Sequence, residues 1–135
     1  DVDHFKAIND SRGHLTGDVV LRTIAARIEG NLRPYDAAIR WGGEEFVIVC
    51  PGMPMAHLVP VAERLRASIG SAPIAIDGQP PLDVTLSGGA LFVPSGTSIT
   101  PGQAIAAADD ALYRAKAEGR NRIVVASSEE LRELG

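Results

Sequence analysis

Apolar residues recur every three or four positions in three long stretches of the chain, the spacing that lines one face of an α-helix. The first stretch is predicted to be capped by Thr16, to carry Asp18 in its first turn and to end near residues 30–31. Its apolar face consists of Val20, Leu21, Ile24 and Ile28. A short helix over residues 4–11 is predicted to precede it and to be closed by a turn-rich segment.

The other two helical stretches differ in how they begin. Residues 55–69 carry an apolar face, but Pro60 has no amide hydrogen, so we expect this helix to begin near Leu58 or to kink. The third stretch opens with a capping box from Thr100 to Gln103 and is predicted to end at Gly119.

Short apolar runs bounded by glycine and proline predict β-strands between the helices. They fall at residues 36–41, 45–50, 73–76, 82–93 and 122–126. Gly42 and Gly43 separate the first two runs, and their freedom to adopt positive φ suits a tight hairpin turn. A second hairpin is predicted around the turn at residues 77–80.

The chain has 135 residues, of which 45% are apolar, enough for one domain with a core. The predicted order β-α-α-β-β-α-β-β-α-β is typical of an α/β (α+β) sandwich, with a mostly antiparallel central sheet flanked by helices. We assign residues 1–126 to this domain and residues 127–135 to a polar C-terminal tail. Because Val2 has the character of a strand end, we expect the domain to be truncated at its N-terminal end.

Charge and cysteine content narrow the class of protein. The chain carries 17 acidic and 13 basic side chains, a net charge of −4, which disfavours a general nucleic-acid binder but not a site for one nucleotide. Cys50 is the only cysteine and lies in an apolar run, so we interpret it as a small buried residue of a reduced, cytoplasmic protein.

Acidic residues gather at two predicted turns. Asp1 and Asp3 flank a strand end, whereas Glu44 and Glu45 follow the glycine pair. If the two segments are neighbours in the sheet, Asp1 and Glu44 can face one cavity and offer the carboxylate oxygens that Mg²⁺ prefers. From spacing alone, solvated acids at strand ends and turns are the favoured interpretation.

Two pairs of charged residues allow both a functional and an ordinary interpretation. Lys116 and Arg120 are four residues apart on a predicted helix, where they can hold phosphates from one face or complement the helix dipole. Arg33 and Asp36 can simply pair on the surface, which contributes little to stability.

The polar residues near the first predicted loop are equally open. Asn9 and Asp18 bracket this loop and carry the amide and carboxylate groups that suit the edge of guanine. Asn9 is also a common turn former, Asp18 a common helix-start charge, and His14 an ordinary loop histidine.

Several separate motifs nevertheless recur in a fixed order along nearly the whole chain. They are Asp1-Val2-Asp3-His4-Phe5-Lys6, Asn9, Gly13-His14, Gly17-Asp18, Arg33-x-x-Asp36, Arg40-Trp41-Gly42-Gly43-Glu44-Glu45-Phe46, and Ala111-Leu112-Tyr113-x-Ala115-Lys116-x-x-Gly119-Arg120-Asn121. On these motifs, residues 1–126 resemble the GGDEF domain of diguanylate cyclases.

The resemblance implies a fold similar to the palm domain of nucleotidyl cyclases and polymerases. It implies an enzyme that condenses two GTP molecules into cyclic di-GMP and two pyrophosphates, with Mg²⁺ or Mn²⁺ as the cofactor. In this family pattern the metal ligands would be Asp1, Glu44 and the backbone carbonyl of Val2. Glu44 would also be the general base.

The same resemblance assigns the remaining site residues by the part of the nucleotide they would contact. They are Asn9, His14 and Asp18 for guanine; Lys116 and Arg120 for the β- and γ-phosphates; Gly42, Gly43 and Glu45 in the active-site loop; and Arg33, Asp36 and Arg64 in an inhibitory site for the product cyclic di-GMP.

Partners follow from the chemistry of the product. Each domain would hold one GTP, so two domains must meet in a two-fold homodimer before either can complete a reaction. An N-terminal sensor or regulatory domain would drive this pairing, and no nucleic-acid partner is expected. We expect a cytoplasmic domain, and the sequence leaves open whether the parent protein is anchored at the inner membrane.

Two alternatives stay open. A silent GGDEF-like receptor would bind GTP or cyclic di-GMP without turnover, although the intact Gly42, Gly43, Glu44 and Phe46 favour the enzyme. A related enzyme could also cyclise a different nucleotide. One departure from the family pattern is Gly88, where a bulky aliphatic residue is usual, and we expect this strand to lose about 1 kcal/mol or more of packing.

Overall fold

The computed structural model describes residues 1–127, which fold into five helices and six strands. The helices are α1 (Phe5–Arg12), α2 (His14–Glu29), the short 3₁₀ helix η1 (Met55–His57), α3 (Leu58–Gly70) and α4 (Pro101–Ala117). The strands are β1 (Ala37–Arg40), β2 (Phe46–Val49), β3 (Ile74–Ile76), β4 (Gln79–Leu82), β5 (Gly88–Ala90) and β6 (Ile123–Val125). The predicted tail at residues 127–135 lies almost entirely outside this described part.

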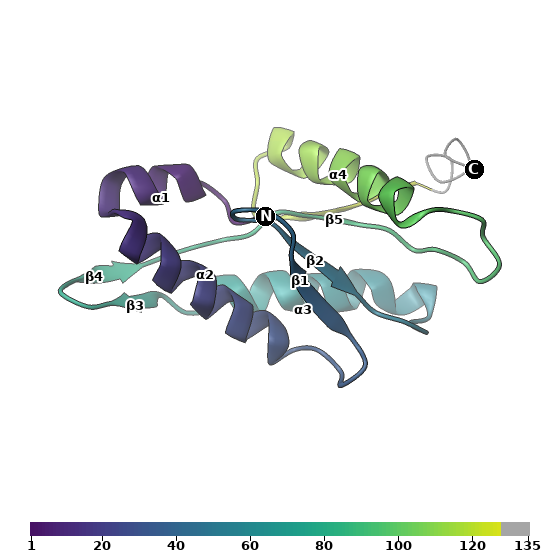
Figure 1. Cartoon of the computed structure of the whole chain (residues 1–135), viewed down its shortest axis with the longest axis horizontal. Coiled ribbons are helices and arrows are strands. Elements are labelled where there is room, and N and C mark those ends of the chain that lie inside the picture. The colour runs from purple at the N-terminus through teal and green to yellow at the C-terminus, as the bar shows by residue number, and fades with distance from the viewer. Residues whose placement is uncertain (128–135) are drawn as a thin grey trace.

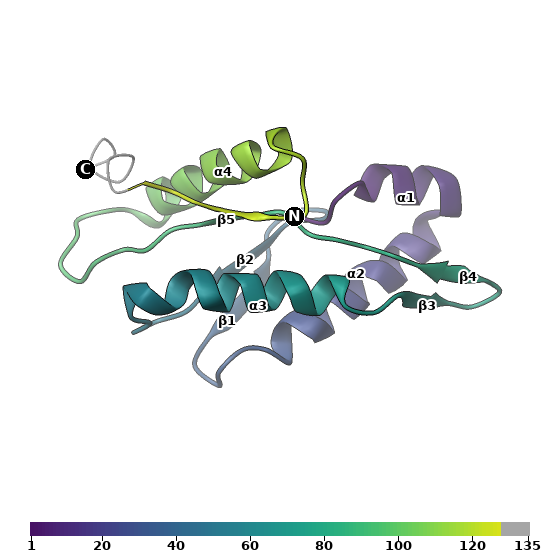
Figure 2. The same ribbon diagram turned by 180° about the vertical axis from the view of Figure 1, so that it is seen from behind.

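The predicted mixture of helices and antiparallel strands is confirmed, but the strands are less continuous than expected. Within residues 1–127 they form three pairs: β1–β2 and β3–β4 are antiparallel, and β5–β6 is parallel. Helix α4 connects the parallel pair and lies against β5, as Figures 1 and 2 show from opposite sides.

The first residues of the chain join two of these pairs. The amide of Val2 donates to the carbonyl of Glu44 at 3.2 Å, next to the β1–β2 hairpin. On its other side Val2 forms an antiparallel bridge with Leu86, just before β5. The strand end predicted at Val2 therefore lies between the hairpin loop and β5, at the middle of the molecule (Figure 1).

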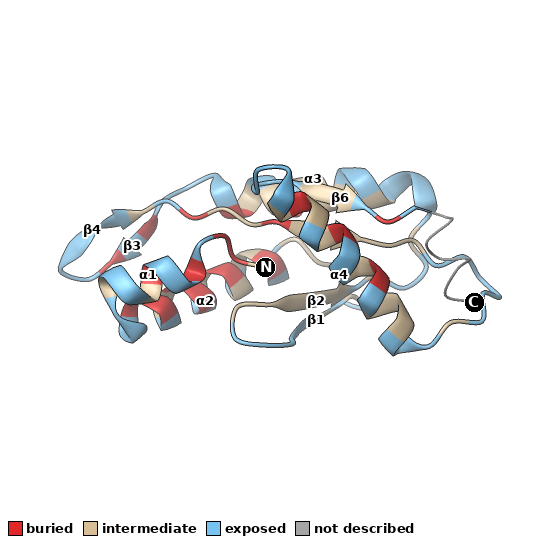
Figure 3. Ribbon diagram, turned by 90° about the horizontal axis from the view of Figure 1, so that it is seen from above, coloured by how far each residue is buried: buried red, intermediate tan, exposed pale blue. Residues whose placement is uncertain are grey.

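The apolar face predicted for the longest early helix is the centre of the core. Val20, Leu21, Ile24 and Ile28 are all at most 4% exposed, and they pack with Leu65 and Ile69 of α3 and with β3. Figure 3 shows the buried positions concentrated along the inward sides of α2 and α4. The amphipathic spacing thus predicted correctly which side of α2 faces the interior.

The predicted start of this helix is wrong. Helix α2 begins at His14, and Gly13, at φ 91°, is its N-cap. Because Gly13 reverses the chain directly after α1, no room is left for a cap at Thr16. Thr16 is instead buried, and its hydroxyl accepts a hydrogen bond from the Gln79 side chain at 3.4 Å. Asp18 consequently lies beyond the first turn.

The start of helix α3 confirms the prediction made from Pro60. Helix α3 begins at Leu58 after the 3₁₀ turn η1, so Pro60 falls in its first turn, where its missing amide hydrogen costs little. The end of α3 is held by Arg27 of α2, whose Nη1 donates to the carbonyls of Ile69 and Ala72 at 2.8 Å each. This side chain satisfies carbonyls that the helix end leaves without partners.

The predicted strand over residues 82–93 is wrong in extent. The hairpin turn is confined to Asp77 and Gly78, with Gly78 at φ 71°, and β4 already begins at Gln79. Pro80 and Pro81 fall within β4. They are tolerated there because, among the described strands, β4 pairs only with β3 and is therefore an edge strand. Beyond β4 the backbone bonds to residues 1–3 instead, so β5 is only three residues long.

Helix α4 has the predicted capping box and approaches β5 closely. Thr100 Oγ1 accepts from the amide of Gln103, and the Gln103 side chain accepts from the amide of Thr100. A Cβ atom on Gly89 would lie 1.9 Å from the carbonyl oxygen of Ala108, so only glycine fits there. A Cβ atom on Gly88 would lie 2.7 Å from Ile123 Cδ1, which shows that Ile123 fills the space beside this glycine.

No helix in the described residues is long and apolar enough to cross a membrane.

Candidate functional site

Three predicted site residues from distant parts of the sequence meet at the N-terminal end of the chain. Lys116, at the end of α4, donates through Nζ to Asp1 Oδ2 at 2.5 Å. The Asp1 side chain is only 4% exposed, whereas that of Lys116 is 35% exposed. The backbone of Glu44 lies beside them, since its carbonyl accepts from Val2. The fold thus brings a buried carboxylate, a cation and the acidic hairpin loop to one place.

These residues suit a hard divalent cation by the chemistry of their donors. Asp1 and Glu44 offer carboxylates and Val2 a carbonyl, all oxygen ligands of the kind Mg²⁺ takes. Within residues 1–127, no group of three or more histidine, cysteine or acidic side chains is arranged to hold a metal ion. A cation here would therefore rely on few protein ligands and on oxygens of a substrate, as Mg²⁺ sites commonly do.

The loop that carries Glu44 is held by Arg40. Arg40 Nη2 and Nε donate to the carbonyl of Gly43 at 2.8 and 3.2 Å, and the amide of Trp41 donates to the carbonyl of Glu45 at 2.9 Å. The loop therefore spans five residues between Arg40 and Phe46, which pair in the β1–β2 ladder. Sequence reasoning did not identify Arg40 as the side chain that fixes this loop.

The prediction that Gly42 and Gly43 use positive φ angles in a tight hairpin turn is wrong. Neither Gly42 nor Gly43 adopts a positive φ, because a five-residue loop needs no tight two-residue turn. Among the described residues, a Cβ atom on Gly43 would have no atom within 4 Å, and one on Gly42 would meet only Glu45, at 3.8 Å. Neither local geometry nor packing within the described part of the chain requires glycine, so the bare backbone is open to an approaching ligand.

Asn9 carries an unusual buried group. Its Oδ1 atom is inaccessible to solvent and has no hydrogen-bond partner among the described residues. A Cβ atom on Gly17 would lie 1.9 Å from this oxygen, so Gly17 makes the room in which the amide sits. A buried acceptor without a donor is costly. The nearby His14 and Asp18 are exposed on the first two turns of α2.

The two predicted phosphate ligands do not share a helix face. Helix α4 ends at Ala117, and Arg120 lies in the following loop with φ 66°. Gly119 at φ 123° unwinds the helix before Arg120, which is why the four-residue helical spacing from Lys116 does not apply. Both residues nevertheless lie at the same end of α4, the end that contacts Asp1.

Asp3 has a structural role that the sequence did not reveal. Its side chain is buried, and its carboxylate accepts from Ser87 Oγ at 2.6 Å, from Thr85 Oγ1 at 2.7 Å and from the amide of Asn121 at 2.9 Å. It therefore joins the N-terminal strand end to the segment before β5 and to the α4–β6 loop. Alternating polar positions at 85 and 87 were the available signal, but nothing in the sequence pairs them with Asp3.

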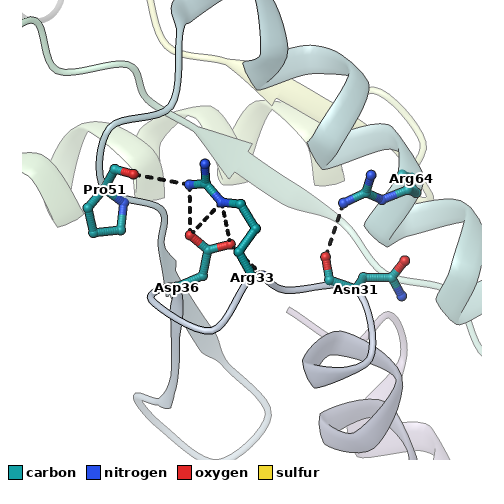
Figure 4. Close-up of polar contacts among 5 residues, drawn as sticks. All are labelled: Asn31, Arg33, Asp36, Pro51 and Arg64. Carbon is teal, nitrogen blue, oxygen red and sulfur yellow. Dashed lines mark hydrogen bonds and ion pairs between the residues drawn. The ribbon is translucent and has the colours of Figure 1, made fainter.

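Arg33 and Asp36 form the predicted pair, with tighter geometry than a surface pair. Arg33 Nη2 and Nε donate to Asp36 Oδ1 at 2.8 and 3.1 Å, and Nη2 also donates to the carbonyl of Pro51 (Figure 4). The Asp36 side chain is 3% exposed. Hydrogen bonding to Arg33 lowers the pKa of Asp36, and the same bonds raise the pKa of Arg33.

Arg64 of α3 contacts the segment that precedes this pair. Its Nη2 donates to the carbonyl of Asn31 at 3.0 Å, in the segment that leads to Arg33 (Figure 4). The Tyr35 ring covers one face of the Arg33 guanidinium, 4.6 Å from ring centre to Cζ. Cys50 is half-buried nearby, and burial together with the Asp36 charge raises the pKa of its thiol. The prediction that Cys50 is a small buried residue is therefore only partly confirmed.

A cavity of about 180 Å³ lies between α2 and the β1–β2 hairpin, with Arg22, Arg40 and Phe46 among its lining residues. Asp1 and Glu44 do not line it. This cavity is therefore distinct from the one expected between these two acids.

Comparison with known proteins identifies the family. The profile of the family described as "Diguanylate cyclase, GGDEF domain" matches residues 1–122. The chain is 42% identical over 125 residues to the response regulator PleD of Caulobacter vibrioides, covering 92% of this chain and 27% of PleD. The chain spans between 18% and 36% of the lengths of the first curated relatives it matches.

Solved structures agree with this assignment. The GGDEF domain of DgcB from Caulobacter crescentus, in complex with c-di-GMP, superimposes with a TM-score of 0.86 at 35% identity, covering 95% of this chain and 75% of that one. The active GGEEF domain of a diguanylate cyclase from Vibrio cholerae gives a TM-score of 0.82 at 30% identity, covering 95% and 80%. The chain belongs to the GGDEF domain family of diguanylate cyclases.

Proposed function

We propose that this domain is one half-site of a diguanylate cyclase that condenses two GTP molecules into cyclic di-GMP and two pyrophosphates. The observation that carries the proposal is the meeting of Asp1, Lys116 and the Glu44 loop at one point of the fold. Carboxylates beside a cation are what a site for a metal-bound triphosphate needs. Family membership and the similarity to a GGEEF cyclase domain support the same reaction.

Each catalytic cycle forms and breaks the same kinds of bond twice. The 3′-oxygen of one GTP attacks the α-phosphorus of the other, a new P–O bond forms, and the bond to pyrophosphate breaks. Glu44, half-buried on the hairpin loop, accepts the proton that the 3′-hydroxyl loses. A Mg²⁺ or Mn²⁺ ion held by Asp1, Glu44 and the Val2 carbonyl would neutralise charge on the phosphates and acidify the hydroxyl.

Lys116 and Arg120 bind the β- and γ-phosphates in this proposal. Lys116 already faces Asp1, and an arriving triphosphate replaces this carboxylate as its partner. Arg120 contributes a planar guanidinium suited to phosphate oxygens. The positive charge at this end of α4 also complements the charge that develops on the leaving pyrophosphate.

Asn9, Asp18 and His14 bind the guanine end. The side-chain amide of Asn9 suits the O6 and N7 side of guanine. Asp18 on the next helix can accept two N–H bonds, which guanine offers and adenine does not. Discrimination against ATP should therefore be strong, because adenine N1 would face the Asp18 carboxylate as a second acceptor.

Cyclic di-GMP is proposed to inhibit the enzyme through Arg33, Asp36 and Arg64. Arg33 is oriented by a hydrogen-bonded Asp36, whereas Arg64 of α3 donates to the carbonyl of Asn31 (Figure 4). Arg64 of a second domain would complete the site across the dimer, and arginines suit the phosphates of the product. The c-di-GMP bound in the similar DgcB structure supports a product-binding role for this family.

The test of the proposal is the variant Glu44→Gln in a form of the domain that is held as a dimer. We expect cyclic di-GMP formation, followed by chromatography, to fall by at least about 10²-fold, since general-base catalysis alone contributes that much. Glu29→Gln, the same change on an exposed position of α2, is the control and should keep the wild-type rate. An unchanged rate in Glu44→Gln would remove the proposed base, and tight nucleotide binding without any wild-type turnover would identify a receptor instead.

A further inference from the structure

The loop that carries Arg120 has an uncommon backbone conformation. Gly119, Arg120 and Asn121 follow one another at φ 123°, 66° and 46°, so three successive residues have positive φ. Glycine and asparagine tolerate this region, but arginine is held in it only when surrounding contacts enforce the conformation. Arg120 is thus presented by a backbone that its neighbours must fix.

The amide of Arg120 donates to the carbonyl of Ala115 at 2.9 Å, and the next residue, Asn121, is fixed by contacts of its own. Its amide donates to Asp3 Oδ2 at 2.9 Å, and its side-chain Oδ1 accepts from Arg66 Nη1 of α3 at 2.9 Å. Arg66 is itself oriented by Glu63, which accepts from its Nε at 2.9 Å. Asn121 is therefore held from two sides, by the N-terminal strand end and by α3.

Asp3 is suited to this task by charge, burial and position. A carboxylate accepts several donors at once, and Asp3 accepts three while its residue is only 4% exposed. Two of its donors, Thr85 and Ser87, belong to the segment before β5, whereas the third is the loop amide of Asn121. Asp3 is also two residues from Asp1, so a single short segment carries both the Lys116 partner and the loop anchor.

We propose that Asp3 is a positioning residue that holds Arg120, through Asn121, in the orientation that meets the terminal phosphates of the bound nucleotide. Asp3 does not touch the nucleotide itself. Arg66 supports the same loop from α3, outside the proposed active site. This inference rests on the proposed function, in which Lys116 and Arg120 contact the β- and γ-phosphates.

The consequence is specific to the phosphates of the ligand. Loss of the Asp3–Asn121 bond removes one of the contacts that fix the backbone around Arg120, which weakens contact with groups that only a triphosphate carries. GTP should lose affinity, whereas GMP, which lacks the β- and γ-phosphates, should bind as before. A purely structural Asp3 would instead lower the fraction of folded protein and leave both dissociation constants unchanged.

The first experiment measures binding of GTP and of GMP by calorimetry for the wild type and for Asp3→Asn. We expect GTP to bind about tenfold more weakly, the equivalent of one charge-assisted contact, with GMP affinity within twofold of wild type. Thr85→Val is the matched control, because it removes another donor to the same Asp3 oxygen without touching the loop. It should keep the wild-type ratio of GTP to GMP affinity.

A second variant keeps the test decisive if Asp3→Asn folds poorly. Arg66→Met removes the side-chain anchor of Asn121 from α3, and we expect a several-fold loss of GTP affinity with GMP unchanged. Hydrogen exchange at the Asn121 amide gives a readout that does not depend on nucleotide binding. Its protection should fall in Asp3→Asn and persist in Thr85→Val.

Arg120→Ala separates failure of this inference from failure of the proposed function. If Arg120→Ala weakens GTP binding but neither Asp3→Asn nor Arg66→Met changes the GTP-to-GMP ratio, the positioning role is overturned and the phosphate role stands. If Arg120→Ala itself leaves GTP affinity unchanged, the phosphate role fails, and the positioning role fails with it.

Discussion

Gly88 and Gly89 are neighbours on β5, yet alanine should be tolerated at the first and not at the second. A Cβ atom on Gly89 would lie 1.9 Å from the carbonyl oxygen of Ala108 and 2.7 Å from the amide nitrogen of Leu112. Both are backbone atoms of α4, so relief requires the whole helix to move away from β5. A Cβ atom on Gly88 would meet Ile123 Cδ1 at 2.7 Å, the end of a flexible side chain that can rotate aside.

The magnitudes follow from these contacts. Overpacking a close-packed interface costs about 3 kcal/mol when a backbone segment must shift, which corresponds to a loss of about 10 °C in Tm for a chain of this length. Gly88→Ala should stay within about 1 kcal/mol of wild type, because the strain on Ile123 is offset by the lower entropy of the unfolded chain.

Urea denaturation of both variants at one protein concentration measures the difference. The expected order of stability is wild type close to Gly88→Ala, with Gly89→Ala well below both. Equal stability of the two alanine variants would refute the close approach of α4 to β5 as the reason for glycine at 89. Because α4 carries Lys116, Gly89→Ala should also weaken GTP binding even where the protein is folded.

Three further predictions concern single side chains. Arg27→Met should lower the free energy of unfolding by about 2 kcal/mol, since the carbonyls at the end of α3 lose a charged donor, and thermal denaturation beside Arg22→Met as the control measures this. The pKa of Asp36 is lowered in the folded protein, so its pairing with Arg33 stabilises the fold above the unfolded-state pKa of about 3.9 and is lost as the pH falls through the lower folded value. The stability difference between wild type and Asp36→Asn should therefore shrink between pH 6 and pH 3 in urea titrations, and a constant difference would contradict this pairing. The raised pKa of Cys50 predicts slow alkylation at pH 7.5 that accelerates only at a higher pH than for a free thiol, as mass spectrometry of iodoacetamide-treated protein can measure.

Patterns among nearby residues correctly predicted several local features of the helices. The buried face of α2, the late start of α3 and the capping box of α4 all depend on residues within a few positions of one another. The end of α4 near Gly119 was predicted correctly, but the shared helix face of Lys116 and Arg120 was not, because Gly119 changes the backbone direction within one residue. Sequence spacing cannot show this without the φ angle.

Long-range contacts account for the other differences. The segment after β4 was predicted as strand, but much of its backbone hydrogen bonding goes to residues 1–3, which lie more than 80 positions away in the sequence. The sequence did not distinguish the role of Asp3 from that of the neighbouring acids. The structure does, because Thr85, Ser87 and Asn121 all donate to its carboxylate. Asp1 and Lys116 were assigned to one site by resemblance alone, and the fold brings them within hydrogen-bonding distance.

The central claim is that this domain is half of an enzyme that needs a second copy to act. The most direct test compares the chain alone with the same chain fused to a dimeric coiled coil, at equal concentrations with GTP and Mg²⁺, and measures cyclic di-GMP by chromatography. Both forms should bind GTP, and only the dimeric form should make product at an appreciable rate. Equal product per chain from a monomer, or GTP binding by the dimer with no cyclic di-GMP formed, would contradict the claim.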